Sequence, residues 1–200
     1  TFWSVFSQLG ALSRRQEILP FSRLADGLLI GEGVGMVTLK RLADAERDRD
    51  RVYAVIKGVG SSSDGSGGSL MSPDVRGQTR ALRVAWADLD PADIGLIEAH
   101  GTGTPAGDEA ELKTLIEVFG PFDDSRSGPL RPGLGSVKSM IGHTMPAAGI
   151  AGLIKATLAV HHGILPPTLY GEAPHPLVES TAFRLIDEAE LWPPELPRSV

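Results

Sequence analysis

Two short apolar runs in this chain each end in a glycine-containing turn that carries a histidine and then leads into a helix-like stretch. One turn is EAHGTGTP, residues 98–105, with His100, and the other is SVKSMIGHT, residues 136–144, with His143. Glycine lets a backbone adopt positive φ or pass close to a ligand. The repeated strand–turn–helix order predicts that both imidazoles lie at the mouth of a site rather than inside a core.

The rest of the chain alternates between strand-like and helix-like patterns. Short apolar, β-branched runs predict strands at residues 35–39, 52–60, 95–99, 134–137 and 182–186. Apolar residues at helical spacing predict helices over residues 74–89, 108–119 and 146–162, the last apolar almost all round and so buried on most sides. We expect residues 1–35 to be irregular, 41–51 to form a short surface helix or turn, and 61–69 and 121–132 to be polar loops. This alternation predicts an α/β fold with layered sheets.

Composition narrows the classes of function. The 200 residues, 42% of them hydrophobic, suffice for one domain or two small ones, and the net charge of −6 argues against nucleic-acid binding. The absence of cysteine excludes disulfides and thiolate metal sites within the chain. The longest apolar stretch, residues 145–165, includes Lys155 and is better explained as a buried helix than as a membrane span. No secretory leader is evident, so we expect a cytoplasmic protein, and both ends suggest a segment of a longer chain.

The residues after His100 suit the binding of an extended, amide-bearing substrate. Thr102 and Thr104 offer hydroxyl groups, and Asp108 suits the N-cap of the next helix, where a carboxylate accepts backbone N–H bonds. A histidine at the end of a strand can equally be structural, and from the residues alone both interpretations stay open.

The turn around His143 suggests an oxyanion-type function. A neutral imidazole at a helix start can donate its N–H to negative charge developing on an oxygen, and two such donors would form an oxyanion site. Lys138 follows an apolar strand and should be partly buried, so it needs a carboxylate partner, for which Glu111 is the candidate. The alternatives are that His143 only satisfies backbone groups and that Lys138 and Glu111 are solvated.

Other motifs carry weaker hypotheses. Residues 31–35, GEGVG, superficially suggest a nucleotide-binding loop, but they precede a strand rather than a helix, so the phosphate-binding rationale fails. The histidine pair 161–162 at a helix end is expected to cap carbonyls, and His175 to lie in a surface loop. A metal site is a further hypothesis without distinctive spacing, with the ligands His100, Asp108 and His143.

The segments EAHGTGTPAGDEAEL, residues 98–112, and GSVKSMIGHTMPAAG, residues 135–149, together resemble β-ketoacyl synthases, the condensing enzymes of fatty-acid and polyketide synthesis. The segments PFSRLADGLLIGEGVGMVTLKRL, residues 20–42, and ILPPTL, residues 164–169, extend this resemblance over nearly the whole chain. The motif HTMPAAG, residues 143–149, is similar to the corresponding motif of type I polyketide and polyunsaturated-fatty-acid synthases. The resemblance implies the thiolase-like layered α/β/α/β/α fold, which this chain would contain incompletely.

The resemblance also implies roles for particular residues. His100 and His143 would be the two histidines of a Cys-His-His active site. Lys138 and Glu111 would be the buried pair that supports them, and Asp108 an acid with a structural role. The nucleophilic Cys, which the family carries upstream at a helix N-terminus, is absent from this chain because its segment is absent.

The implied activity is a decarboxylative Claisen condensation between an acyl thioester and a malonyl-type thioester on an acyl carrier protein. Thr102 and Thr104 would contact the phosphopantetheine arm, and no bound cofactor or metal is implied. Residues 1–50 would be the tail of the N-terminal half, and 51–200 most of the C-terminal half without its final strands. The intact enzyme would be a homodimer, and the 200-residue piece alone is expected to be inactive.

Two other classes of protein stay open from the sequence. One is a Cys-less, non-catalytic carrier-binding or scaffold protein with the same fold, although such a homologue need not retain both histidines. The other is a metal hydrolase built on the hypothetical metal site described above.

Overall fold

Three short parallel strands form the centre of the molecule. The computed structural model describes residues 2–63, 65, 73–122, 130–169 and 173–200. The parallel sheet has the order β1-β2-β4, with β1 (Leu96–Glu98), β2 (Gly133–Gly135) and β4 (Arg184–Leu185). A separate antiparallel pair consists of β3 (Ile164–Leu165) and β5 (Glu190–Leu191). In the parallel sheet, Glu98 pairs with Gly135, so the segments after β1 and β2 leave the same edge.

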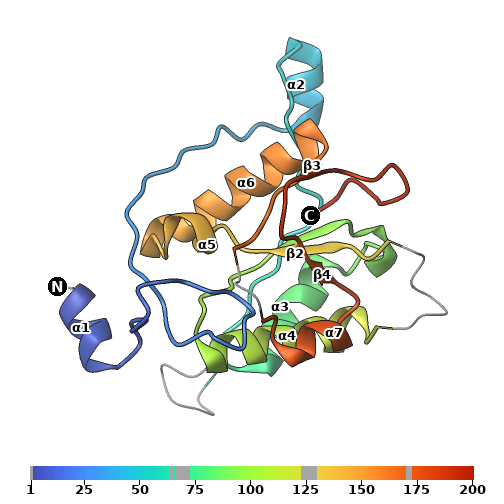
Figure 1. Ribbon diagram of the computed structural model, residues 1–200. Helices are drawn as coiled ribbons and strands as arrows, with labels where there is room; N and C mark the ends of the chain where they lie inside the picture. The colour runs from blue at the N-terminus through green and yellow to red at the C-terminus, as the bar shows by residue number, and fades with distance from the viewer. Residues whose placement is uncertain (1, 64, 66–72, 123–129, 170–172) are drawn as a thin grey trace.

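Helices cover both faces of the parallel sheet (Figure 1). The helices are α1 (Phe2–Gln8), α2 (Leu42–Asp48), α3 (Val75–Ala85), α4 (Pro105–Phe119), α5 (Lys138–Ile141), α6 (Ala148–His162) and α7 (Pro176–Ser180), and the 3-10 turns are η1 (Pro91–Asp93) and η2 (Met145–Ala147). Helices α3, α4 and α7 lie on one side of the strands and α6 on the other. The predicted layered α/β arrangement is therefore confirmed.

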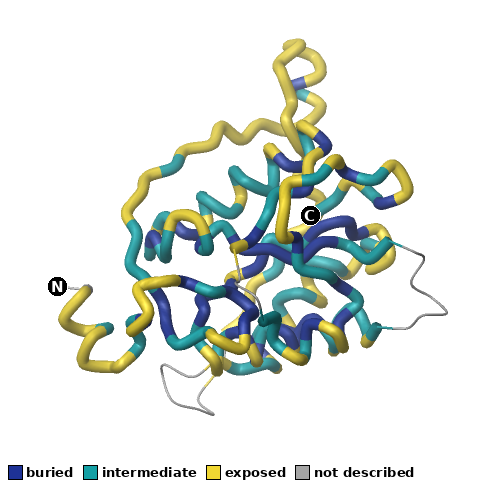
Figure 2. Tube along the Cα trace, viewed as in Figure 1, coloured by how far each residue is buried: buried dark blue, intermediate teal, exposed yellow. Residues whose placement is uncertain are grey.

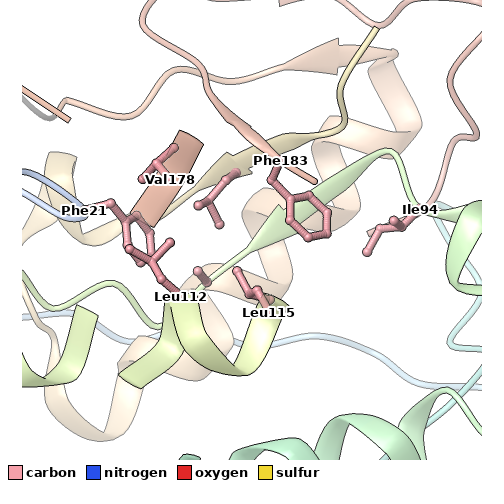
Figure 3. Packing of buried hydrophobic residues seen from close by; sticks show 8 residues of the cluster. Phe21, Ile94, Leu112, Leu115, Val178 and Phe183 are labelled. Carbon is pink, nitrogen blue, oxygen red and sulfur yellow. The ribbon is translucent and has the colours of Figure 1, made fainter. Parts of the chain in front are cut away.

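Two apolar clusters fill the spaces between these layers. The first joins the sheet to α4 and α7, and Figure 3 labels two of its fully buried members, Leu112 and Phe183. Leu134 of β2 is fully buried in the same cluster. The second joins the sheet to α6 and β3, and includes Leu96 and Ala159. Both faces of the sheet are buried, as is usual for parallel strands, and each strand contributes a leucine to the apolar clusters: Leu96, Leu134 and Leu185.

The helices that follow the two histidine turns begin and end at local signals. Helix α4 starts after Thr104 with Pro105 at its first position, where a missing N–H costs nothing, and it ends at Gly120. Helix α6 ends at Gly163, whose φ of +66° suits glycine. The strands predicted over 95–99, 134–137 and 182–186 and the helices predicted over 74–89, 108–119 and 146–162 are all present, with shifted ends.

Two other predicted strands are wrong. Residues 35–39 and 52–60 run extended but form no β-pairs within the part of the chain that the structure describes. Several of their apolar side chains face solvent: Met36, Leu39 and Val59 are 88%, 71% and 78% exposed, and Figure 2 shows residues 33–41 as an exposed arc. A β-branched pattern alone cannot make a strand, because a strand also needs a neighbour to complete its hydrogen bonds.

The N-terminal region and helix α6 also differ from expectation. Residues 1–35 are not wholly irregular, because they include α1. Helix α6 is half-buried rather than buried on most sides, with Leu153 and Leu158 exposed. One side of this helix and residues 33–35 line an apolar cavity of about 540 Å³. The surface helix within 41–51 is confirmed as α2, whereas most of the predicted loops at 61–69 and 121–132 lie outside the described residues.

Among the described residues, no helix combines the length and the apolar character that crossing a membrane requires.

Candidate active site

The side chains of His100 and His143 lie next to each other. Their ring centroids are 5.4 Å apart, and the ring planes meet at 85°, an edge-to-face contact. His100 directly follows β1, whereas the His143 backbone pairs with an N-terminal segment: its N–H donates to the Leu29 carbonyl at 2.8 Å, and its carbonyl accepts from the Gly31 N–H at 3.0 Å. Three segments distant in sequence therefore meet at the two imidazoles.

The hydrogen bonds of His143 define which ring nitrogen carries the proton. The Met145 backbone N–H donates to Nδ1 of His143 at 3.1 Å, so Nδ1 is the acceptor and Nε2 carries the hydrogen in the neutral ring. Burial, and then the positive charge of Lys138, lower the pKa of His143. At neutral pH the residue is therefore an uncharged imidazole with a free Nε2–H donor.

His100 is also neutral at physiological pH. Desolvation, then the charges of Lys138 and His143, lower its pKa to about 4. The residue as a whole remains exposed, so solvent reaches the ring and screens part of the Lys138 charge. The direction of the shift still follows from the packing against His143 and from the ammonium group nearby.

Lys138 and Glu111 hold the peptide groups of the His100 turn from two sides. Nζ of Lys138, a buried residue, donates to the His100 carbonyl at 2.5 Å. The two carboxylate oxygens of Glu111 accept from the N–H groups of His100 and Gly101, at 2.7 and 2.8 Å. Both groups thus form hydrogen bonds with the backbone of the turn rather than with the imidazole itself.

The charges of Lys138 and Glu111 support each other electrostatically. Burial lowers the pKa of Lys138, and the carboxylates of Glu111 and Glu98 oppose that shift. Burial raises the pKa of Glu111, and its two backbone hydrogen bonds and Lys138 oppose that shift. Lys138 is buried as expected, but its ammonium group bonds to the His100 carbonyl and interacts with Glu111 only through charge, without a direct ion pair.

Thr102 and Thr104 lie side by side at the start of α4. Their hydroxyl oxygens are 2.9 Å apart, and Thr102 is buried while Thr104 is half-buried. Gly107 leaves them room, because a Cβ there would lie 2.5 Å from Oγ1 of Thr104. A hydroxyl has one donor and two acceptor positions, so this pair keeps capacity for a further hydrogen bond.

Asp108 is not the helix N-cap that the sequence suggests. The N-cap of α4 is Thr104, and Asp108 lies within the helix, buried at 1% exposure. Its carboxylate accepts from the Phe21 N–H at 2.7 Å and from the Gly103 N–H at 3.2 Å. Asp108 therefore ties the residue 20–21 loop to the His100 turn, because tertiary packing offers it donors that the helix end does not.

Asp108 makes stability depend on pH. Burial raises the pKa of Asp108 to about 7, against about 4 in an unfolded chain. The folded chain binds this proton more tightly, so the stabilising contribution is full below about pH 4 and is lost as pH rises through about 7. We expect Asp108→Asn, which keeps an acceptor for the Phe21 N–H, to remove this decline in thermal unfolding of the full-length protein between pH 4 and 8.

The comparison with wild type isolates Asp108 from its neighbours. His100, with its lowered pKa, contributes stability that increases from about pH 4 to about 6.5, opposite to Asp108, and is present in both proteins. Exposed Asp88→Asn serves as the control and should leave the pH dependence unchanged. Parallel pH profiles for wild type and Asp108→Asn would contradict the buried, proton-binding role.

Two features of the site were missed by sequence reasoning. Glu98 and Lys155 form a nearly buried ion pair below the His100 turn. A lysine inside an apolar helix was the available signal, because a buried ammonium needs a carboxylate. Gly31 of the GEGVG motif lies against the His143 turn, and a Cβ there would be 2.1 Å from the Ile141 carbonyl oxygen. The motif therefore serves close backbone packing.

The other histidines lie away from this site. His175 is the N-cap of α7, with Nδ1 accepting from the Leu177 N–H at 3.2 Å, so it does more than occupy a surface loop. His161 stacks on Tyr53 at 4.8 Å between ring centroids. Within the described parts of the chain, no three His, Asp or Glu side chains are arranged to hold a metal ion. The metal hypothesis therefore has no ligand set there.

The comparisons with known proteins agree on one family. The profile described as "Beta-ketoacyl synthase, C-terminal domain" matches residues 53–172, and "Beta-ketoacyl synthase, N-terminal domain" matches residues 2–45. The PKS-NRPS hybrid synthetase ATPKS of Aspergillus niger is 44% identical over 198 residues, which cover 97% of this chain and 10% of that protein. The spectinabilin polyketide synthase system protein NorB of Streptomyces orinoci is 45% identical over 193 residues, covering 94% of this chain and 9% of that protein.

Solved structures give the same result for the fold. The ketosynthase from module 6 of the bacillaene synthase of Bacillus subtilis 168 superposes with a TM-score of 0.89 at 35% identity, covering 97% of this chain and 35% of that one. The chain thus spans about a tenth of the curated relatives and about a third of this ketosynthase. The predicted thiolase-like fold, present in part, is confirmed. The family profile covers more than half of the chain, and the chain belongs to the β-ketoacyl synthase family.

Proposed function

We propose that this chain is part of the ketosynthase of a type I polyketide synthase and supplies the two histidines of its decarboxylative condensation. The observation that carries the proposal is the edge-to-face contact of His100 and His143, both held neutral by their surroundings. Neutral imidazoles offer N–H donors without a fixed positive charge, which suits an oxygen that becomes negative only during reaction. The polyketide synthases and ketosynthases that the chain resembles support the substrate class.

The condensation begins with an acyl group on a cysteine thiolate, which must lie outside these residues because the chain has no cysteine. The bond between the malonyl Cα and its carboxylate breaks, CO₂ leaves, and the electron pair passes to Cα and the thioester oxygen as an enolate. His143 Nε2–H and a ring N–H of His100 donate to that oxygen. Cα then attacks the acyl carbonyl, a C–C bond forms, and the cysteine thiolate leaves, so the product is a 3-ketoacyl thioester.

The surrounding residues position these groups and the substrate. Lys138 and Glu111 fix the His100 peptide, and Asp108 anchors the turn that follows it. Thr102 and Thr104 are placed beside this turn and would bond the amide-bearing phosphopantetheine arm of an acyl carrier protein. In this proposal the condensation uses no cofactor or metal bound to the ketosynthase, because the substrate is attached to the phosphopantetheine arm of the carrier protein.

The proposal also includes the place of this chain in the complete ketosynthase and the oligomeric state of that enzyme. Residues 1–50 belong to the end of the N-terminal ketosynthase half and 51–200 to most of the C-terminal half. The complete enzyme is a cytoplasmic homodimer that binds its acyl carrier protein transiently.

The test is whether the full-length protein decarboxylates a malonyl thioester that is carried on an acyl carrier protein. The reaction is followed by measuring the CO₂ released and the ketoacyl product formed. We expect both to occur, with condensation requiring prior acylation of a cysteine. A full-length protein that binds the carrier but releases no CO₂ would support the scaffold alternative instead.

A further inference from the structure

We propose that the buried ion pair between Glu98 and Lys155 is a positioning element that aligns His100 and His143 for reaction. The inference rests on the condensing function proposed above and adds two residues to its machinery. Nζ of Lys155 in α6 lies 2.7 Å from Oε2 of Glu98, the last residue of β1. The two side chains are 11% and 6% exposed, and the contact lies outside hydrogen-bond angles, so charge attraction holds it.

The second carboxylate oxygen of Glu98 makes a different connection. Oε1 accepts from the Val137 N–H at 2.6 Å, and Val137 is the N-cap of α5. One carboxylate therefore joins the end of β1 to the start of α5 and, through Lys155, to the middle of α6. Glu98 thus connects three elements through the two oxygens of a single side chain.

Each of these three elements leads to a group of the active site. His100 follows closely after Glu98, and Lys138, whose Nζ holds the His100 carbonyl, directly follows Val137. Helix α6 begins shortly after His143. A shift of any one element relative to the others changes the 5.4 Å contact between the two rings. The ion pair is therefore placed to control the separation and angle of the imidazoles.

Two glycines lie next to the ion pair. A Cβ on Gly152 would lie 3.4 Å from Cγ of Glu98, and a Cβ on Gly135 would lie 3.4 Å from Nζ of Lys155. Gly152 precedes Lys155 by one helical turn, on the side of α6 that faces β1. Both distances correspond to ordinary van der Waals contact. At Gly135 the tighter contact is with Oγ1 of Thr168, which would lie 2.6 Å from such a Cβ.

Stability alone is a weak reason for such a pair. Lys155 lines the apolar cavity along α6, among side chains such as Ile141 and Ile154. Removing two charges from water costs free energy that their attraction often fails to recover, so apolar residues of similar size are frequently as stable. What apolar residues cannot replace is the directional link from one carboxylate to both Val137 N–H and Lys155.

The test compares Glu98→Gln, Lys155→Met and the double variant in the full-length protein. Two rates are measured for each: decarboxylation of the malonyl carrier thioester, which uses the histidines, and self-acylation of the cysteine, which precedes that step. Thermal unfolding is followed in parallel. We expect both single variants to lower the decarboxylation kcat by about 10- to 100-fold, the range that misplacement of reacting groups causes, with self-acylation nearly unchanged.

The double variant separates positioning from stability. It leaves no unpaired buried charge, so we expect its melting temperature to return close to that of wild type while decarboxylation stays slow. The matched control is Glu109→Gln/Lys113→Met, which removes a 2.6 Å ion pair on the exposed side of α4 and should change neither rate.

Two other outcomes would separately contradict the positioning role of the ion pair and the proposed condensing function. Recovery of the decarboxylation rate together with stability in the double variant would refute the positioning role and leave the condensing function intact. A wild-type protein that is folded and acylated but does not decarboxylate the malonyl thioester would refute the proposed function itself.

Discussion

Replacing His143 with alanine will slow decarboxylation of the malonyl carrier thioester by about 100-fold or more in the full-length ketosynthase, the usual cost of losing one oxyanion donor. The Met145 N–H fixes the ring so that Nε2–H is the free donor, and no other described group takes its place beside His100. Self-acylation of the cysteine should be affected far less. CO₂ release at single turnover is the measurement.

Two variants define the specificity of that effect. His143→Gln retains an amide N–H and should recover part of the rate, whereas His162→Ala removes an exposed imidazole at the end of α6 and should leave the rate unchanged. Wild-type decarboxylation in His143→Ala would exclude the oxyanion role, whatever its effect on condensation.

Replacing Glu111 with glutamine will destabilise the His100 turn although the side chain keeps its size. Two backbone N–H groups, of His100 and Gly101, need two acceptors, and the carboxylate supplies both. An amide supplies one acceptor and turns its NH₂ toward the other donor, which leaves a buried N–H unsatisfied at a cost of about 1–3 kcal/mol. The neutral side chain also removes the carboxylate charge that most opposes the lowering of the Lys138 pKa. We expect a lower melting temperature and decarboxylation slower by about tenfold or more.

The control for this change lies on the same helix. Glu117 is exposed on α4 and pairs with Arg83 at 3.3 Å, so Glu117→Gln should alter stability by no more than about 0.5 kcal/mol. Equal behaviour of Glu111→Gln and Glu117→Gln would show that the two amide contacts do not organise the turn.

The strand–turn–helix units were predictable because their signals are local. Pro105 and Gly163 mark where α4 begins and α6 ends, and apolar spacing shows which faces of the helices are buried. The layered α/β arrangement follows from that alternation. The candidate histidines were also visible, since glycines next to His100 and His143 mark turns.

The long-range partners were not predictable in the same way. Asp108 suits an N-cap by its type, but its donors are Phe21 and Gly103, which only the folded chain brings close. Glu98 and Lys155 lie in different elements, and no local pattern links them. The extended segments 35–39 and 52–60 fail as strands for a related reason, because pairing depends on a neighbour and not on their own residues.

The exposed arc formed by residues 33–41 has a practical consequence for anyone preparing this polypeptide. Its bare amide and carbonyl groups, flanked by outward valine and methionine, can template edge-to-edge association with another copy. The apparent molar mass of the 200-residue product alone, measured by light scattering, should therefore rise with concentration, and its yield from refolding should fall. Substituting Val34 and Met36 with lysine would suppress this self-association and would leave the two active-site imidazoles unchanged.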